Sequence, residues 1–430
     1  MTILGILLFL LGLLLAVALH ELGHLIPAKK FGVKVSQYFV GFGPTMFSRT
    51  IHGTEYGVKW ILLGGYVRLC GMLAPAKAGT PITTRDGQLT MAEQARRESA
   101  AELAPGEEEQ AFWRLTPGKK FVVMFGGPFV NFLLAVLFFA IVWLGIGVST
   151  FSNQIGTISP CLDATQTQCA DADATPAAKS QLQPGDHVLS WDGVEISNWE
   201  ELQNAIKTRG SGRKTVEVLR EGQSKTLSVD VVSLERPQIA DGAVVTDSAG
   251  EPVLAAQPYV GIGPQIIRER QALSELPAQI WNLAFGTAKI VVTLPVQLWN
   301  IGVSLFSDAP RDASGVVGLV GIADIASSIT STDNVQYDFA ARTADLLLLF
   351  ASLNMSLFIF NLIPLLPLDG GHILGVLIEA VQHKFAQLRG KSDPGAFDTA
   401  RLLPLSQVVI FCFLAMTVFL IIADIVKPAV

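Results

Sequence analysis

Five consecutive residues near the N-terminus, His20-Glu21-Leu22-Gly23-His24, have the types and the spacing needed to bind and use a zinc ion. On an α-helix, residues i and i+4 lie on one face, so His20 and His24 can offer two imidazole nitrogens to one Zn²⁺. Glu21 then reaches a metal-bound water and acts as the general base. The pattern favours hydrolysis of a peptide bond at zinc.

A hydrolytic zinc ion usually takes three protein ligands and leaves its fourth position to water. The best candidate for the third ligand is Asp369, which follows two prolines and precedes Gly370-Gly371. These neighbours interrupt a helix, so the carboxylate can turn toward the ion. His372 is not expected to be a ligand, because two residues so close together after a glycine turn rarely reach one ion.

Two asparagines lie near these motifs and are predicted to bind substrate. Asn361 lies one to two turns before Asp369, where its amide can hydrogen-bond an extended substrate backbone or tie two helices together; both interpretations stay open. Asn131 ends the motif Gly126-Gly127-Pro128-Phe129-Val130-Asn131, whose small residues permit close helix approach. We expect Asn131 beside the site, because a polar group inside a membrane needs a partner.

The composition is that of an integral membrane protein, since half of the 430 residues are hydrophobic and only 16% are charged. A helix needs about 20 apolar residues to cross a bilayer. Five segments come close to this length: 3–25, 121–148, 280–306, 345–366 and 405–426. The segment 280–306 contains Lys289 and Pro295, so it is predicted to lie along the membrane interface. Four transmembrane helices remain.

The expected location is the cell inner (plasma) membrane, as a multi-pass protein, and the charge distribution predicts that the N-terminus lies outside. Residues 26–120 hold 13 Lys and Arg in 95 residues, whereas 148–340 hold 12 in 193, which favours a cytoplasmic first loop. A cleaved signal peptide is disfavoured, because no basic residue precedes the first apolar stretch. With four crossings, His20, His24 and Asp369 all lie toward the cytoplasmic side. A fifth crossing would put Asp369 at the opposite face.

Residues 155–263 have the pattern of a compact α/β module outside the cytoplasm. A strand over 187–191 meets an Asp-Gly turn, and Asn198 is placed to cap a helix over 199–209. Strands over 215–220 and 225–231 follow, then a polar inserted loop over 233–257 and a last strand at Tyr259-Val-Gly-Ile. This order fits a bacterial-type PDZ domain, which generally binds an extended peptide end at a strand edge. Cys161 and Cys169 can form a disulfide if this region is extracytoplasmic.

The segment between the first two spans alternates apolar residues with glycine turns and predicts short hairpin strands beside the site. An edge strand there can hold an extended substrate, or the region can be a cap without substrate contact. Residues rich in Ala, Glu and Arg follow, and we assign this linker no chemistry.

The sequence thus predicts an α-helical polytopic membrane protein with four transmembrane helices, an inserted extracytoplasmic α/β PDZ domain and a membrane-associated β-hairpin region. The expected parts are as follows: 1–30, transmembrane helix with the HExxH motif; 31–73, membrane-associated β region; 74–118, cytoplasmic linker; 119–148, transmembrane helix; 155–263, PDZ domain; 275–325, interfacial helices; 341–373, transmembrane helix with the LDGG motif; 403–427, transmembrane helix.

Together these motifs resemble the site-2 protease family of intramembrane zinc metalloproteases. The resemblance rests on HELGH at 20–24, GFGP at 41–44, GGYV at 64–67, GGPFVN at 126–131, SGVVGLVGIA at 314–323 and NLIPLLPLDGGHI at 361–373. It implies a Zn²⁺ cofactor and substrates that are single-span membrane proteins within the lipid bilayer. A single PDZ domain is most similar to actinobacterial members, which implies anti-sigma factors already trimmed by a site-1 protease. Leu62 and Val316 stand where the family often has proline, which affects loop geometry but no ligand.

Two other functions are consistent with parts of the pattern. One is a non-catalytic membrane-anchored PDZ adaptor whose metal motif is inert. The other is a zinc transporter, which needs further carboxylates along a membrane path, whereas Asp345 and Asp424 lie near span ends. Nucleic acid is not an expected partner, because the net charge is −6 and no basic cluster alternates with aromatic residues.

Overall fold

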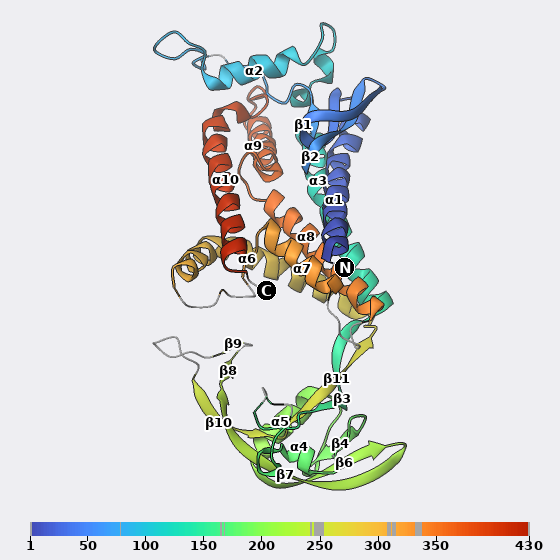
Figure 1. The fold of residues 1–430 in the computed structure, drawn as a ribbon. Helices are drawn as coiled ribbons and strands as arrows, with labels where there is room; N and C mark the ends of the chain where they lie inside the picture. Colours follow the sequence, from blue (N-terminus) through green and yellow to red (C-terminus); the bar gives the residue numbers. More distant parts are fainter. Residues whose placement is uncertain are drawn as a thin grey trace. The chain divides into compact units, whose positions relative to one another are not determined.

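The computed structural model describes residues 2–77, 79–163, 166, 168–240, 243–244, 253–307, 311, 315–331 and 338–428. The chain divides into two compact units. The membrane unit comprises Met1–Gly145 and Ala272–Val430, and the sheet unit comprises Ile146–Gln271. Figure 1 shows that the membrane unit is mainly helical, whereas the other is built on a twisted sheet.

The membrane unit contains eight α-helices among its described residues, with short 3₁₀ turns and one π-helical turn between them. The α-helices are α1 Thr2–Lys30, α2 Met91–Ala101, α3 Pro117–Ala140, α6 Leu276–Leu305, α7 Leu319–Ser331, α8 Phe339–Asn361, α9 Asp369–Leu388 and α10 Leu403–Val426. The shorter turns are η1 Glu108–Gln110, η2 Phe112–Arg114, η3 Ile141–Ile146, η5 Leu273–Glu275 and η6 Thr399–Leu402.

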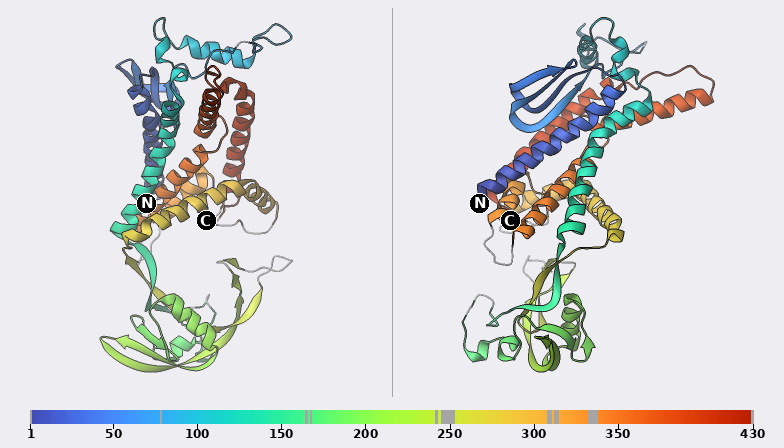
Figure 2. Two further views of the ribbon diagram at one scale, coloured as in Figure 1. Left: turned by 180° about the vertical axis from the view of Figure 1, so that it is seen from behind. Right: turned by 90° about the vertical axis from the view of Figure 1, so that its right-hand side faces the viewer.

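Five helices within the described residues are long and apolar enough to cross a membrane: Gly5–Lys30, Pro117–Ile146, Leu273–Leu305, Phe339–Asn361 and Thr399–Val426. They match the five apolar segments of the sequence. The helix α6, which belongs to the third, runs across the direction of α1 and α3 in the views of Figures 1 and 2.

Helices α1 and α3 pack with their backbones in direct contact. A Cβ atom built on Gly23 would lie 2.4 Å from the carbonyl oxygen of Gly126, and one on Gly126 would lie 2.1 Å from that of Gly23. Any side chain at either position would separate the helices. The predicted role of the small residues in 126–131, close helix approach, is therefore confirmed.

The predicted short hairpin strands are instead two long bent strands, β1 Val35–Ile51 and β2 Thr54–Leu69. Tyr38 pairs with both Val67 and Tyr56, so the first half of β1 lies between the two halves of β2. Glycines with positive φ, such as Gly41 and Gly64, allow the bends. The glycines that were expected to separate short strands are therefore bends within β1 and β2, whose backbones pair along both strands.

The predicted transmembrane helix 341–373 is two helices, because α8 ends at Asn361 and α9 begins at Asp369. The prolines between them lack the N–H that an unbroken helix needs. Cβ atoms on Gly370 and Gly371 would meet backbone atoms of 362–366 at 2.3 to 2.6 Å. The two glycines let the connecting loop pack on the first turn of α9. The predicted interruption of the helix before Asp369 is confirmed.

The C-terminal helix α10 is tied to the segment before α7 by a buried ion pair. Arg311 donates to the Asp424 carboxylate at 2.9 Å, and Asp424 also accepts from the N–H of Gly321 at 2.8 Å. The Val316 N–H donates to Gln297 Oε1 at 3.2 Å, a bond that proline cannot make. This hydrogen bond is a local structural reason for valine, in place of the family's usual proline, at position 316.

The sheet unit has strands in the order β10-β7-β6-β4-β3-β11, with β5 paired to β4 and a separate pair β8-β9. The strands are β3 Val148–Ile158, β4 His187–Trp191, β5 Val194–Glu195, β6 Gly212–Arg220, β7 Gln223–Pro237, β8 Ile239–Ala240, β9 Ala243–Val244, β10 Leu254–Tyr259 and β11 Ile262–Glu269, with helices α4 Pro176–Lys179 and α5 Trp199–Arg209 and the turn η4 Asp171–Asp173. Trp191 and Leu202 lie at the centre of its apolar core.

Most local predictions for the sheet unit are confirmed. Asn198 Oδ1 accepts from the Glu201 N–H at 2.9 Å, and Gly210 ends α5 with a φ of 68°. Cys161 and Cys169 form a disulfide. The predicted loop 233–257 is wrong in part, because the end of β7 pairs with β10 there. Such polar strands are held by backbone hydrogen bonds and show no apolar alternation in the sequence. Residues 241–242 and 245–252 of this predicted loop lie outside the described residues.

Candidate metal centre

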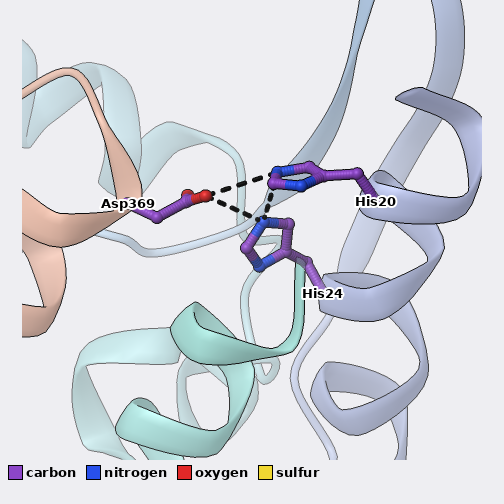
Figure 3. Close-up of side chains that lie close together, drawn as sticks. All are labelled: His20, His24 and Asp369. Atoms are coloured by element: carbon purple, nitrogen blue, oxygen red, sulfur yellow. Dashed lines mark hydrogen bonds and ion pairs between the residues drawn. The ribbon is translucent and has the colours of Figure 1, made fainter. Parts of the chain in front are cut away.

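Three side chains from two distant parts of the sequence converge in the membrane unit (Figure 3). His20 and His24 come from the last third of α1, and Asp369 is the first residue of α9. The two Nε2 atoms lie 3.2 Å apart, and Asp369 Oδ2 lies 3.3 Å from that of His20 and 3.4 Å from that of His24. The residues predicted as metal ligands therefore form one compact triangle.

Helix α3 fixes the orientation of one imidazole. His24 Nδ1 lies 2.8 Å from the carbonyl oxygen of Val123, which can only accept, so Nδ1 carries the proton and donates. In the neutral ring, Nε2 then presents a lone pair toward His20 and Asp369. A backbone carbonyl that holds the outer nitrogen of a histidine is the usual support of a metal ligand.

The donor set fits a zinc ion. Nitrogen and oxygen atoms bound about 2.0–2.1 Å from a tetrahedral zinc are separated by about 3.3–3.4 Å, close to the sides of this triangle. Asp369 Oδ2 is buried and, among the described residues, lacks a hydrogen-bond partner. Three lone-pair atoms turned toward one point repel one another unless a cation or protons lie between them.

A cavity of about 580 Å³ opens beside the triangle. Glu21, the predicted general base, lines it, and so do Asn361 and His372. A Cβ on Gly65 would lie 3.3 Å from Glu21 Cγ, so the β2 backbone packs directly against this glutamate. His20, His24 and Asp369 line the same cavity, so it gives access to the three converging atoms.

Asn131 lies apart from the cavity surface. Its side chain is completely buried on α3 and is not among the residues that line the cavity. Neither its Oδ1 nor its Nδ2 has a hydrogen-bond partner within the described parts of the chain. Of the two predicted substrate-binding asparagines, only Asn361 reaches the cavity.

The cavity has a wall that the sequence did not reveal. Residues of α2 and its C-cap, from the linker to which no chemistry was assigned, line it beside the second half of β2: Ala95, Glu98, Ser99 and Glu102, with Gly65 to Leu69. Burial raises the pKa of Glu102 above its usual range, although Arg68, 3.8 Å away, opposes this. The pattern of α2 is that of a solvated helix, and nothing in it marks a neighbour of the metal ligands.

Helix α2 is tied to the C-terminal part of the membrane unit by a buried arginine. Arg96 donates from Nη2 to both carboxylate oxygens of Asp398 at 2.9 and 2.7 Å, next to η6. Its side chain is only 4% exposed. Arg96 and Asp398 lie far apart in the sequence, so no local pattern reveals that they pair. The composition of the segment around Arg96 therefore indicated only a linker.

Comparison with known proteins gives a family match over most of the chain. Residues 8–393 match the family described as "Peptidase family M50". The chain is 28% identical to "Zinc metalloprotease Rip1" of Mycobacterium tuberculosis (strain H37Rv), covering 100% of this chain and 98% of that protein. It is also 28% identical to "Metalloprotease MmpA" of Caulobacter vibrioides, covering 88% of each.

Proposed function

Because the chain belongs to peptidase family M50, the site-2 protease family, we propose that it is an intramembrane zinc metalloendopeptidase. The observation that carries this proposal is the triangle of His20, His24 and Asp369 beside a cavity that also contains Glu21. The names of the curated relatives support zinc as the metal. We propose the three residues of the triangle as its ligands.

When bound, zinc supplies Lewis acidity toward water and toward the scissile carbonyl group. Glu21 is the proposed general base, which takes a proton from the attacking water and later gives it to the leaving amine. The backbone of Gly65 packs against Glu21 and restricts its side chain. His24 keeps its orientation through the bond from Nδ1 to Val123.

The substrate is proposed to enter as an extended segment. A helical segment hides its peptide bonds, so it must unwind before water can attack one of them. Residues 65–69 of β2 line the cavity and offer a strand edge on which an unwound segment can be held by backbone hydrogen bonds. We propose that Asn361, which also lines the cavity, binds the same segment through its amide. A substrate contact by Asn131 stays a prediction. Its side chain is completely buried and does not line the cavity.

We propose four membrane crossings, with α6 along the interface. If α6 also crossed, Asp369 would lie across the about 30 Å hydrocarbon core from the two histidines, and no triangle would form. The crosswise course of α6 supports this count. With the N-terminus outside, the site faces the cytoplasmic side of the plasma membrane, and residues 155–263 lie outside the cytoplasm.

The sheet unit is proposed to be a PDZ domain in an oxidising compartment. The capped helix α5, the turn at Asp192-Gly193 and the disulfide between Cys161 and Cys169 support this assignment. The proposed substrates are single-span membrane proteins, such as anti-sigma factors shortened beforehand by a site-1 protease. This proposed substrate class rests on the family resemblance alone.

The decisive experiment compares membranes from cells that carry the native chain with membranes from cells that carry Glu21→Gln. Single-span proteins are expected to accumulate truncated but uncut in the variant, while the purified variant still binds zinc. Glu109→Gln, the same change at an exposed glutamate, serves as the matched control. Normal turnover by Glu21→Gln would contradict its role as base. An unchanged cell phenotype would favour the PDZ adaptor.

A further inference from the structure

Three buried polar atoms on α1 and α3, the two helices that hold and orient the histidines, have no hydrogen-bond partner among the described residues. They are Nδ1 of His20 and both amide atoms of Asn131. Buried polar groups are nearly always paired in folded proteins, and each exception needs a reason. His24 is not such an exception, because its Nδ1 donates to the Val123 carbonyl oxygen on α3. His20 has no such support assigned.

The contact between α1 and α3 places Asn131 relative to His20. Gly127 lies directly against His24, because a Cβ on Gly127 would come within 2.2 Å of His24 Nε2. The two helices run in opposite directions, as Figure 1 shows. His20 is one turn before His24 on α1, and Asn131 is one turn after Gly127 on α3. Both steps therefore lead the same way along the interface.

Close packing keeps these two residues at the same level. The backbones touch at Gly23 and Gly126, and helices that approach this closely interlock through rows of residues four apart. Asn131 also continues the buried row on α3 that includes Met124, which lines the metal cavity, and Gly127. Its amide thus lies at the depth of His20, on the inner side of α3.

We propose that Asn131 is a positioning residue for His20: its Oδ1 accepts a hydrogen bond from His20 Nδ1–H when the metal is bound. The inference rests on the proposed zinc function. Helix α3 then holds both imidazoles, one through the Val123 carbonyl and the other through an amide side chain. Fixing the proton on Nδ1 turns the His20 Nε2 lone pair toward the ion. Of the three unpaired atoms, His20 Nδ1 and Asn131 Oδ1 then bond each other, and Asn131 Nδ2 is left over.

The test is the zinc affinity of the purified full chain in detergent, measured by competition with a chromogenic chelator. Asn131→Leu keeps the volume of the side chain but removes the acceptor, and zinc affinity is expected to fall on the order of 10–100-fold. Asn131→Asp keeps an acceptor oxygen and is expected to restore most of the affinity. The visible spectrum of the Co²⁺-loaded protein should change in Asn131→Leu and stay near native in Asn131→Asp.

The matched control is Asn354→Leu on α8. Asn354 is also completely buried, and its Oδ1 is also unpaired among the described residues, but its Nδ2 donates to the Phe350 carbonyl within its own helix. This variant is expected to bind zinc as the native chain does. Equal losses in Asn354→Leu and Asn131→Leu would mean general loosening of the bundle and would overturn the proposal.

Two further results separate this inference from the proposed function. If the native chain binds zinc and Asn131→Leu binds it equally well, Asn131 does not position His20, and only this inference fails. If Asn131→Leu raises KM for a substrate while zinc affinity is unchanged, the residue meets substrate instead, and the inference is again wrong. A native chain that binds no zinc would remove the proposed function itself.

Discussion

Lys120 of α3 and Glu379 of α9 form an ion pair inside the membrane unit, with Nζ 2.7 and 2.9 Å from the two carboxylate oxygens. Both side chains are about 5% exposed or less. Glu379 also accepts from the Phe397 N–H at 2.9 Å. Since α9 begins at Asp369 and α3 carries Val123, the pair links the helix of the third proposed ligand to the helix that orients His24.

Breaking this ion pair on one side is expected to destabilise the protein strongly. Lys120→Met leaves the Glu379 carboxylate buried without its partner, which typically costs about 3–5 kcal/mol. The double variant Lys120→Met/Glu379→Leu removes both charges and should recover much of the loss. Thermal unfolding in detergent measures both effects. A double variant no more stable than the single one would contradict this account.

Removing the third proposed ligand is expected to release the metal. Asp369→Asn has nearly the same shape but no charge, so the purified chain should lose more zinc affinity than the about 10–100-fold that loss of an outer-shell support costs. His372→Ala should keep one zinc per chain, because His372 is not expected to be a ligand. Metal analysis after dialysis against a weak chelator gives the answer. Zinc loss in His372→Ala would require a revised ligand set.

A methyl group at Gly127, which is not a proposed ligand, is expected to disturb the metal centre by displacing a ligand. The new Cβ would lie 2.2 Å from His24 Nε2, so the ring must move. Gly127→Ala should therefore lose zinc affinity and activity, although alanine favours helix by about 1 kcal/mol. Gly118→Ala is the control on the same helix, since its Cβ would meet nothing within 4 Å. Comparable activity in the two variants would contradict the close contact.

The sheet unit should lose stability in acid through Asp186. Burial by itself raises the pKa of this carboxyl, but Arg220, which donates at 2.6 and 2.7 Å, holds the pKa below its usual range. The pair therefore stabilises the fold fully above the unfolded-chain pKa of about 3.9, and this contribution disappears as pH falls through the lower folded pKa.

Asp186→Asn removes the charge and is expected to speed amide hydrogen exchange in β4 and β6 at pH 7. Between pH 5 and pH 2 the variant should also lose less stability than the native chain. Asp230→Asn, at an exposed position of the same unit, is the control. Identical acid dependence in the native chain and Asp186→Asn would show that another group governs it.

Deletion of residues 155–263 is expected to loosen control of proteolysis and to leave the chemistry intact. All three proposed ligands and Glu21 belong to the membrane unit, which has its own helix contacts. Cleavage of a substrate already trimmed outside the membrane should persist, and untrimmed substrate should be cut faster. Gel analysis of both substrates tests this. Loss of cleavage of the trimmed substrate would assign the deleted residues a direct part in catalysis.

Local sequence patterns predicted much of the fold because their physical causes are local. The spacing of His20 and His24 places both on one face of a helix wherever that helix lies. The prolines and glycines around Asp369 end one helix and start another. Asn198 caps α5 and Gly210 ends it through groups only a few residues away.

The sequence by itself therefore determined the identity of the candidate ligands, the apolar helices and the turn-bounded strands of the sheet unit. Only the tertiary structure decided that α2 lines the cavity, that Arg96 reaches Asp398, and that Asn131 is buried away from the cavity. Each of these depends on which helices pack together, and packing joins surfaces whose partners lie far away in the chain. No pattern within a single segment encodes such a partner.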